Sequence, residues 1–192
     1  MVIILQTIRE LAKSEIEVKK SRFIGLVFPI SDVLEVKKYL DQVKKEYKGA
    51  NHYCYAYRTP SFEKYDDDKE PSKTAGYPLL ELLTKKDLTN VLAIVIRYFG
   101  GIKLGAGGLI RSYQKALKEA LDQAVIVPFT TYVYYELVFS YENEAKINKY
   151  LKDLVVSKEY ADKVKYTIKV ATSSQEEILE NIAGLIERTK RK

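Results

Sequence analysis

The apolar positions near the start of the chain change from a strand period to a helix period. Residues 16–20 and 22–30 are rich in Ile, Val and Phe, which predicts a pair of strands. Apolar residues then recur at helical spacing over about residues 32–47, after the candidate N-cap Ser31-Asp32. The first segment therefore predicts two strands followed by an amphipathic helix.

The middle of the chain continues this mixed pattern. An aromatic strand is predicted over residues 51–58, and a polar loop over 59–77. A short helix (76–84), a buried strand (90–98) and an amphipathic helix (109–123) follow. Alternation within the aromatic strand places His52, Cys54, Ala56 and Arg58 on one face, and Tyr53, Tyr55 and Tyr57 on the other.

The last third of the chain has its own alternation of strands and helices. A short connector at 125–128 predicts a boundary between two α+β domains, residues 1–126 and residues 127–192. The order strand, helix, strand, strand, helix predicts a small ferredoxin-like domain one strand short of the six-element form. The predicted ranges are 130–141, 142–154, 155–160, 163–171 and 175–189.

A glycine-rich segment joins the buried strand to the helix at 109–123. Five of the nine glycines lie between Gly100 and Gly108, accompanied by cations. Glycine lets a backbone approach a neighbour closely, and a helix N-terminus with basic side chains favours an anion. The segment therefore predicts a site for phosphate groups or a nucleic-acid backbone. Its candidate residues are Arg97, Gly100, Gly101, Lys103, Gly105, Gly107, Gly108 and Arg111, together with Lys73.

Two standard phosphate-binding motifs are excluded in this segment. A P-loop needs Lys-Ser/Thr after Gly105, where the chain has Ala106-Gly107. A dinucleotide fingerprint needs a third glycine at the position of Ile110. A purely structural role, in which the glycines let the helix pack against the sheet, stays open.

Several residue pairs invite catalytic or metal-binding hypotheses. His52 and Cys54 share a strand face as the only histidine and the only cysteine, so a thiol–imidazole dyad is one interpretation and a buried structural thiol is the other. This scarcity excludes a His/Cys zinc site. The acidic run at 66–70 suits either a Mg²⁺ ion or simple solvation, and it lacks the EF-hand pattern. We therefore expect no catalytic residue, no metal and no cofactor.

Composition limits the class of protein. The chain has 32 basic and 26 acidic residues, a net charge of +6, which modestly favours polyanionic partners. One cysteine excludes an intrachain disulfide and fits a cytoplasmic location. The apolar run at residues 2–5 is too short for a signal peptide or a membrane span, and no stretch approaches about 18 apolar residues. No membrane association is therefore expected.

Four segments together resemble the IMPACT/YigZ family. They are Lys20–Gly25, His52–Arg58, Asp67–Gly76 and Val95–Arg111, and the resemblance covers roughly residues 14–124. The family pattern Asp-Gly-Glu-Pro-Ser-Gly-Thr-Ala-Gly-Arg/Lys-Pro is changed here, with Lys69 and Lys73 in place of glycines and Tyr77 in place of the cation. The last part of the chain is similar to the family's C-terminal domain in length and pattern only.

The resemblance implies both a fold and a function class. It implies an N-terminal domain with the ribosomal-protein-S5 domain-2-like fold, similar to domain IV of elongation factor G, and a smaller ferredoxin-like C-terminal domain. Eukaryotic members of the family are translational regulators that act through a protein partner. By analogy we expect a translation-associated role here.

Three functional hypotheses follow. The first is a non-enzymatic translation-associated regulator that binds RNA, the ribosome or a translation-related partner through the basic glycine-rich segment. The second is a module that binds an acidic protein partner through the same surface. The third is a small-molecule enzyme with a pocket near His52, Asp67 and Glu70. The face of Tyr53, Tyr55 and Tyr57 has two interpretations, stacking on bases or packing on a helix.

Overall fold

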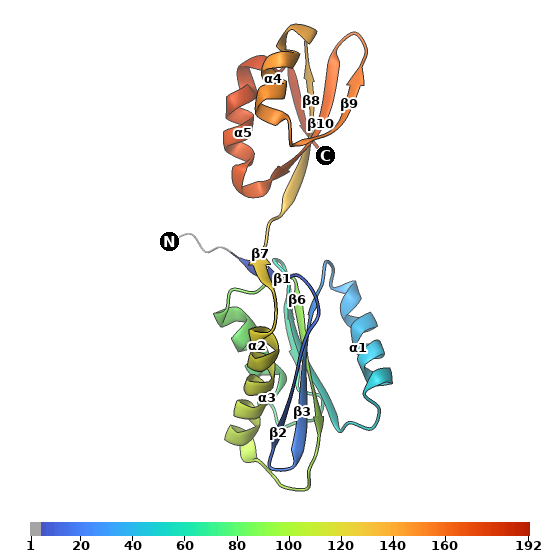
Figure 1. Ribbon diagram of the computed structural model, residues 1–192, viewed down its shortest axis with the longest axis vertical. Coiled ribbons are helices and arrows are strands. Elements are labelled where there is room, and N and C mark those ends of the chain that lie inside the picture. Colours follow the sequence, from blue (N-terminus) through green and yellow to red (C-terminus); the bar gives the residue numbers. More distant parts are fainter. Residues whose placement is uncertain (1–4) are drawn as a thin grey trace. The chain divides into compact units, whose positions relative to one another are not determined.

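The chain folds into two compact units, each described by itself. The computed structural model describes residues 5–192, so most of the apolar run at residues 2–5 lies outside the described residues. The first unit ends at Phe129, and the second runs from Thr130 to Lys192. Each unit has its own sheet and its own buried apolar cluster, as Figure 1 shows. No helix in the described part of the chain is long and apolar enough to cross a membrane.

The first unit is built on a five-stranded antiparallel sheet with the order β2-β3-β6-β4-β5. The predicted strands near 22–30, 51–58 and 90–98 are confirmed. One strand of this sheet, β5, lies inside the segment that was predicted to be a polar loop. The strands are β2 (Ala12–Val18), β3 (Ser21–Pro29), β6 (Val91–Tyr98), β4 (His52–Arg58) and β5 (Glu63–Asp66).

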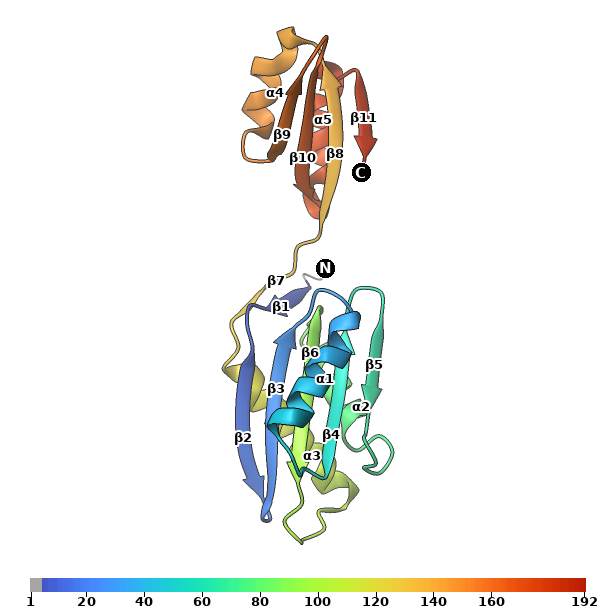
Figure 2. The same cartoon turned by 90° about the vertical axis from the view of Figure 1, so that its right-hand side faces the viewer.

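Helices cover both faces of this sheet. Helix α1 (Leu34–Glu46) lies on one face, and α2 (Gly76–Lys85) and α3 (Gly105–Asp122) lie on the other, as Figures 1 and 2 show. The central strand β6 is buried throughout all but its last residue because successive side chains enter opposite clusters. Ile94 and Ile96 join the cluster under α1, whereas Val95 joins the cluster under α2 and α3.

Strand β4 confirms the predicted division of its faces. Cys54 and Ala56 lie in the cluster on the α2–α3 side. The three tyrosines lie on the α1 side, where Tyr53 donates a hydrogen bond from its hydroxyl to the carbonyl of Tyr47 at 2.6 Å. The structure therefore supports the interpretation in which these tyrosines pack on a helix, since all three join the apolar cluster that contains Val36 and Val43 of α1.

Residues near 125–128 form a strand rather than a free connector. Strand β7 (Ile126–Pro128) pairs with β1 (Gln6–Ile8) in an antiparallel ladder. The amide of Phe129 also donates to the carbonyl of Leu5 at 2.9 Å. The domain boundary expected after residue 126 thus falls inside an element that closes the first unit.

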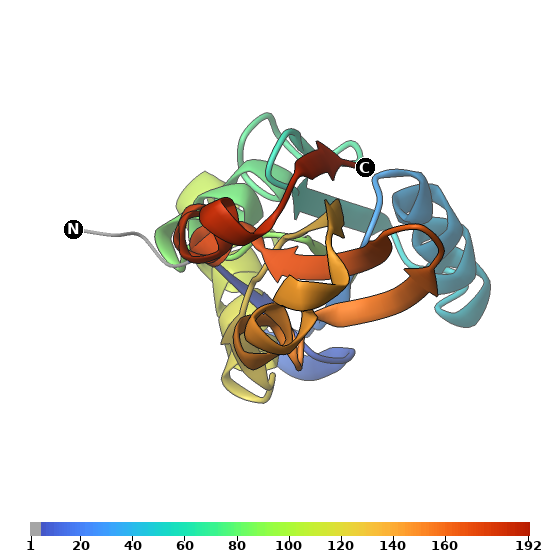
Figure 3. The ribbon, with the colours of Figure 1, turned by 90° about the horizontal axis from the view of Figure 1, so that it is seen from above.

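The second unit has the complete six-element ferredoxin-like order. Its sheet order is β11-β8-β10-β9, and all neighbouring strands are antiparallel. Both helices lie on one face of the sheet, as Figures 2 and 3 show. The elements are β8 (Tyr132–Phe139), α4 (Glu144–Leu151), β9 (Val155–Tyr160), β10 (Val164–Ala171), α5 (Gln175–Ile182) and β11 (Arg188–Arg191).

The prediction of one helix over 175–189 is wrong. The prediction that the domain is one strand short is therefore also wrong, because the last strand begins within that range. Helix α5 ends at Ile182, and a 3-10 turn follows over Ala183–Leu185. Residues 188–191 then pair with β8 as an edge strand. Gly184 lowers helix propensity at the break, and the charged Arg-Thr-Lys-Arg sequence hides a strand because all four of its residues are exposed.

The first unit should fold alone when it ends after β7. We expect a fragment of residues 1–129 to unfold cooperatively, and a fragment of 1–126 to be less stable by about 1–2 kcal/mol, since it loses ladder hydrogen bonds of about 1 kcal/mol each. Urea unfolding followed by circular dichroism measures both. Equal midpoints for the two fragments would show that β7 adds nothing to the first unit.

Candidate functional site

The glycine-rich segment packs against the turn between β2 and β3. A Cβ on Gly100 would lie only 1.9 Å from the carbonyl oxygen of Lys20, so only glycine fits there. The amide of Gly100 donates to the side-chain hydroxyl of Ser21 at 3.1 Å. The segment and the turn therefore lie together at one end of the first unit, the lower end in Figures 1 and 2.

Helix α3 begins earlier than the sequence pattern predicted, at Gly105 rather than near Leu109. Gly101 and Gly105 have positive φ angles of 84° and 70°, and they turn the chain into the helix. Gly107 and Gly108 therefore belong to the start of the helix rather than to a loop. No described side chain caps this N-terminus, so its first backbone N–H groups are available to an anionic ligand.

Arg97 is buried in an ion pair rather than displayed on the surface. It is 4% exposed, and its guanidinium Nη1 donates to Glu70 Oε1 at 2.7 Å. The Tyr113 hydroxyl donates to the same oxygen at 2.7 Å. Burial raises the pKa of Tyr113, so its hydroxyl stays protonated and keeps this role. Arg97 thus fixes the neighbouring segments together and does not act as a free surface cation.

His52 is oriented toward Glu70. Its Nδ1 lies 2.8 Å from the carbonyl oxygen of Asp68, and since a carbonyl only accepts, Nδ1 carries the proton. Nε2 then lies 3.7 Å from Glu70 Oε1. Sequence reasoning placed His52 and Glu70 near one pocket but could not show that Arg97 and Tyr113 meet the same carboxylate.

Cys54 does not form a reactive dyad with His52. Its side chain is fully buried, and its thiol lies 3.0 Å from the carbonyl oxygen of Asp67. Burial raises the pKa of the Cys54 thiol, so the thiolate needed for nucleophilic attack is disfavoured. The structure supports the interpretation of a buried structural thiol.

The acidic run serves to hold the loop before α2. The Asp67 carboxylate accepts hydrogen bonds from the amides of Lys73 at 2.8 Å, Ala75 at 3.0 Å and Gly76 at 2.8 Å. It thereby satisfies amides at the N-terminus of α2. Within the described residues no group of three or more His, Cys, Asp or Glu side chains has the arrangement of a metal site.

A cavity of about 410 Å³ lies above the Arg97–Glu70 pair. Its volume is in the range of about 300–1,000 Å³ that small-molecule sites occupy. Pro71, Phe99, Leu104 and Leu109 supply apolar lining, and the start of α3 closes one side. Its polar lining comes from His52, Glu70, Arg97 and Lys103.

Basic side chains surround the neighbouring surface. A second depression of about 290 Å³ shares Leu104 with the cavity and is lined by Lys19, Arg111 and Lys115. Lys19 and Lys20 form the two-residue turn that packs on Gly100. Sequence reasoning missed these two lysines because it placed them at the end of a strand over 16–20, whereas β2 ends at Val18 and leaves them in a hairpin turn. We call the exposed set the basic end: Lys19, Lys20, Lys103, Arg111 and Lys115.

Lys73 lines neither the cavity nor the depression beside it. Its Nζ lies 5.4 Å from the centre of the Tyr77 ring. Lys69 and Lys73, the two positions where the family pattern has glycine, have positive φ angles of 71° and 59°. The loop therefore keeps a backbone conformation that favours glycine although lysines occupy it.

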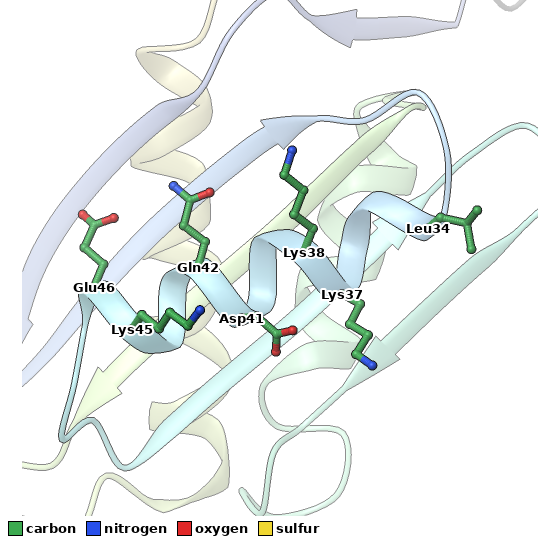
Figure 4. A pocket seen from close by; sticks show the side chains of 7 residues that line it. All are labelled: Leu34, Lys37, Lys38, Asp41, Gln42, Lys45 and Glu46. Carbon is green, nitrogen blue, oxygen red and sulfur yellow. The ribbon is translucent and has the colours of Figure 1, made fainter.

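A depression along α1 is not a binding cleft. It has a volume of about 870 Å³, and all of its lining residues come from α1. Figure 4 shows the side chains along this single helix, with Lys37, Asp41 and Lys45 among them. Its mixed charges and lack of a second wall describe a solvated helix face.

The fold and the site define a two-unit α+β protein with a basic, glycine-rich end beside a small cavity. Residues 19–121 match the Impact N-terminal domain, and the chain belongs to the IMPACT family. It is 44% identical over 124 residues to the IMPACT family member YvyE of Bacillus subtilis, covering 63% of this chain. It is 36% identical over 124 residues to the IMPACT family member YigZ of Escherichia coli, covering 60% of this chain.

The sequence match covers only part of the length of these two relatives. A solved structure, in contrast, matches the fold of both units. The aligned part spans 57% of YvyE and 61% of YigZ. A solved structure described as the crystal structure of an hypothetical protein matches with a TM-score of 0.69 at 26% identity, covering 95% of this chain and 93% of the other. The α+β fold class predicted from the sequence is confirmed.

Replacing Gly100 by alanine should disrupt the packing of the glycine-rich segment on the turn between β2 and β3. We expect Gly100→Ala to lower the free energy of unfolding by about 3 kcal/mol, because the new Cβ meets backbone atoms of Lys20. Gly107→Ala is the matched control, since its Cβ meets only the flexible Arg111 side chain at 3.4 Å. Alanine there should be neutral or stabilising by up to about 1 kcal/mol. Equal effects in urea titrations would contradict the packing argument.

Removing the Asp67 carboxylate should loosen the loop that carries Glu70. Asp67→Ala is expected to lower the free energy of unfolding by about 2–3 kcal/mol, since three backbone amides lose a charged acceptor. Asp66→Ala is the control, because among residues 5–192 that carboxylate accepts only from the amide of Asp68. Thermal unfolding of both variants measures the difference, and a smaller loss for Asp67→Ala would refute the loop-holding role.

Proposed function

We propose that this protein is a non-enzymatic, translation-associated regulator that contacts RNA phosphate groups through its basic end. Membership in the IMPACT family supports the translation-related part of the proposal. The main support for RNA binding is the packing of Gly100 on the turn at Lys20. This packing brings Lys19 and Lys20 close to the cations of the glycine-rich segment. A cytoplasmic location belongs to the same proposal.

The chemistry of the basic end suits backbone contacts. Lys103 and Arg111 are exposed and form no ion pair with any described residue. Uncapped N–H groups at the start of α3 add donors for phosphate oxygens. Such donors hold a phosphate backbone without reading base edges, so the expected binding is independent of sequence.

The cavity favours a second candidate function, the binding of a small molecule. His52 Nε2 and Lys103 line it, and the buried Arg97–Glu70 pair forms its polar floor. A ligand of this cavity would combine an anionic group near α3 with an apolar part near Phe99. Isothermal titration with inorganic phosphate and with adenosine monophosphate tests it, and heat from neither would remove this candidate.

Salt dependence tests the RNA proposal. We expect duplex RNA to bind with a slope of log K against log[salt] of roughly −2 to −4, since about 0.7–0.9 is contributed by each neutralised phosphate. The double variant Lys103→Gln/Arg111→Gln should flatten the slope by about 1.4–1.8 by the same rule. Fluorescence anisotropy at several salt concentrations gives both slopes.

A charge-matched control separates a site from net charge. The double variant Lys37→Gln/Lys45→Gln removes two positive charges from exposed positions of α1 and should leave the slope unchanged. If both double variants flatten the slope equally, net charge alone drives binding. If no RNA binds even at low salt, an acidic protein partner becomes the better explanation of the basic end.

A further inference from the structure

The sheet of the second unit has one face that its own helices leave uncovered. Helices α4 and α5 lie on the opposite face, as Figures 2 and 3 show. Strand β8 alternates, so that Val133, Tyr135 and Leu137 enter the core and the intervening residues point to the uncovered face. Two aromatic residues occupy that face, Tyr132 at 52% exposure and Tyr134 at 40%.

Cations flank this aromatic row on both sides. On β10, Lys169 pairs with Tyr134 and Lys165 with Val138. On β11, Lys190 pairs with Glu136 and Arg188 with Val138. Paired residues of antiparallel strands project to the same face, so these side chains share the surface with the tyrosines. Lys192 follows on the same edge, where its amide donates to the carbonyl of Tyr134 at 2.9 Å.

The charges on this face are only partly neutralised. Lys165 pairs with Glu159 at 3.3 Å, and Lys192 pairs with Glu136 at 3.3 Å. Among the described residues, neither Lys190 nor Arg188 forms an ion pair, and Lys169 lies 4.2 Å from the centre of the Tyr132 ring. The face thus combines exposed rings with a surplus of positive charge.

This combination matches one class of partner. Aromatic rings flanked by cations bind single-stranded nucleic acid, because bases stack on the rings while the cations neutralise phosphates. Tyr132 and Tyr134 are two residues apart on one strand, so their Cα atoms are separated by roughly 6.8 Å. This is about twice the 3.4 Å rise per nucleotide of a stacked strand. The spacing therefore suits a strand whose bases are not stacked on one another. A duplex does not offer such bases, because its base faces are covered by the neighbouring base pairs.

We propose that the uncovered sheet face of the second unit binds single-stranded RNA through Tyr132 and Tyr134. The surface is distinct from the basic end of the first unit, and the choice of RNA as partner rests on the proposed function. The rings hold unpaired bases, and Lys169, Lys190 and Arg188 contact the phosphates beside them. The two surfaces therefore differ in what they recognise: the basic end binds any phosphate backbone, and the sheet face requires accessible bases.

The test is a fluorescence-anisotropy titration of the full chain with a labelled 12-nucleotide oligouridylate and with an RNA duplex of the same length. Tyr132→Ala/Tyr134→Ala should weaken oligouridylate binding at least about ten-fold, since each stacked base is worth about 5- to 150-fold in affinity. Duplex binding should change less than about two-fold. Tyr132→Phe/Tyr134→Phe keeps both rings and should retain the affinity of the unmodified protein.

A matched control addresses the removal of an exposed tyrosine in general. Tyr150 is 52% exposed on α4, and Tyr150→Ala should leave oligouridylate binding unchanged. Circular dichroism confirms that each variant is folded. Unchanged oligouridylate affinity in the double alanine variant would overturn the proposal, as would an equal loss for single strand and duplex. Competition by polyglutamate equal to that by oligouridylate would also overturn it, because the face would then recognise charge alone.

The same titration separates this proposal from that for the basic end. Lys103→Gln/Arg111→Gln should weaken both RNA forms, whereas the tyrosine variant should weaken only the single strand. If only the tyrosine variant has an effect, the sheet face stands and the basic end fails. If only the lysine–arginine variant has an effect, the sheet face fails. If the unmodified protein binds neither RNA at low salt, both proposals fail.

Discussion

The buried ion pair between Arg97 and Glu70 holds together the segments that form the cavity of the first unit. Arg97 comes from the end of β6, Glu70 from the loop before α2, and Tyr113 adds a hydrogen bond from α3. Loss of one partner would leave a buried charge uncompensated, which typically costs about 3–5 kcal/mol. The pair therefore matters less as a source of stability than as a constraint on these three segments. If one of them moved away, a charged side chain would be left buried without its partner.

This constraint depends in turn on the backbone of the loop. Asp67 holds the amides at the start of α2, and the loop bends so that Glu70 points inward while Asp66 stays exposed. Gly76 completes the arrangement, since a Cβ there would lie 2.4 Å from the carbonyl oxygen of Asp66. Neighbouring carboxylates of one acidic run thus have different roles, one satisfying backbone amides and one neutralising a buried guanidinium. Their spacing alone could not distinguish these roles from solvation.

Hydrophobic periodicity predicted the long elements because their burial is regular. Strand β6 and helices α1 and α3 present continuous apolar faces, and they occur close to the expected positions. Strand β11 escaped prediction because an exposed edge strand carries charges where a buried strand carries apolar residues. The start of α3 at Gly105 was also missed, because glycine has a low helix propensity and a glycine-rich segment is therefore predicted to be a loop.

The candidate site was predictable in residue type but not in exposure. Arg97 and Lys103 are both basic residues near the same glycines, yet a partner 27 residues away buries one and leaves the other exposed. Only tertiary contacts make that distinction, so Arg97 shapes the cavity while Lys103 is free to meet a ligand.

The two lysines of the turn between β2 and β3 adopt an unfavourable backbone conformation. Lys19 and Lys20 have positive φ angles of 46° and 63°, a conformation that costs a residue with a side chain roughly 1–2 kcal/mol and glycine almost nothing. Placing lysine there retains positive charge beside Gly100 at the expense of backbone strain. The two-residue turn between β2 and β3 needs a positive φ at both positions, so the strain follows from the turn geometry, and the packing of the first unit does not require the charge itself.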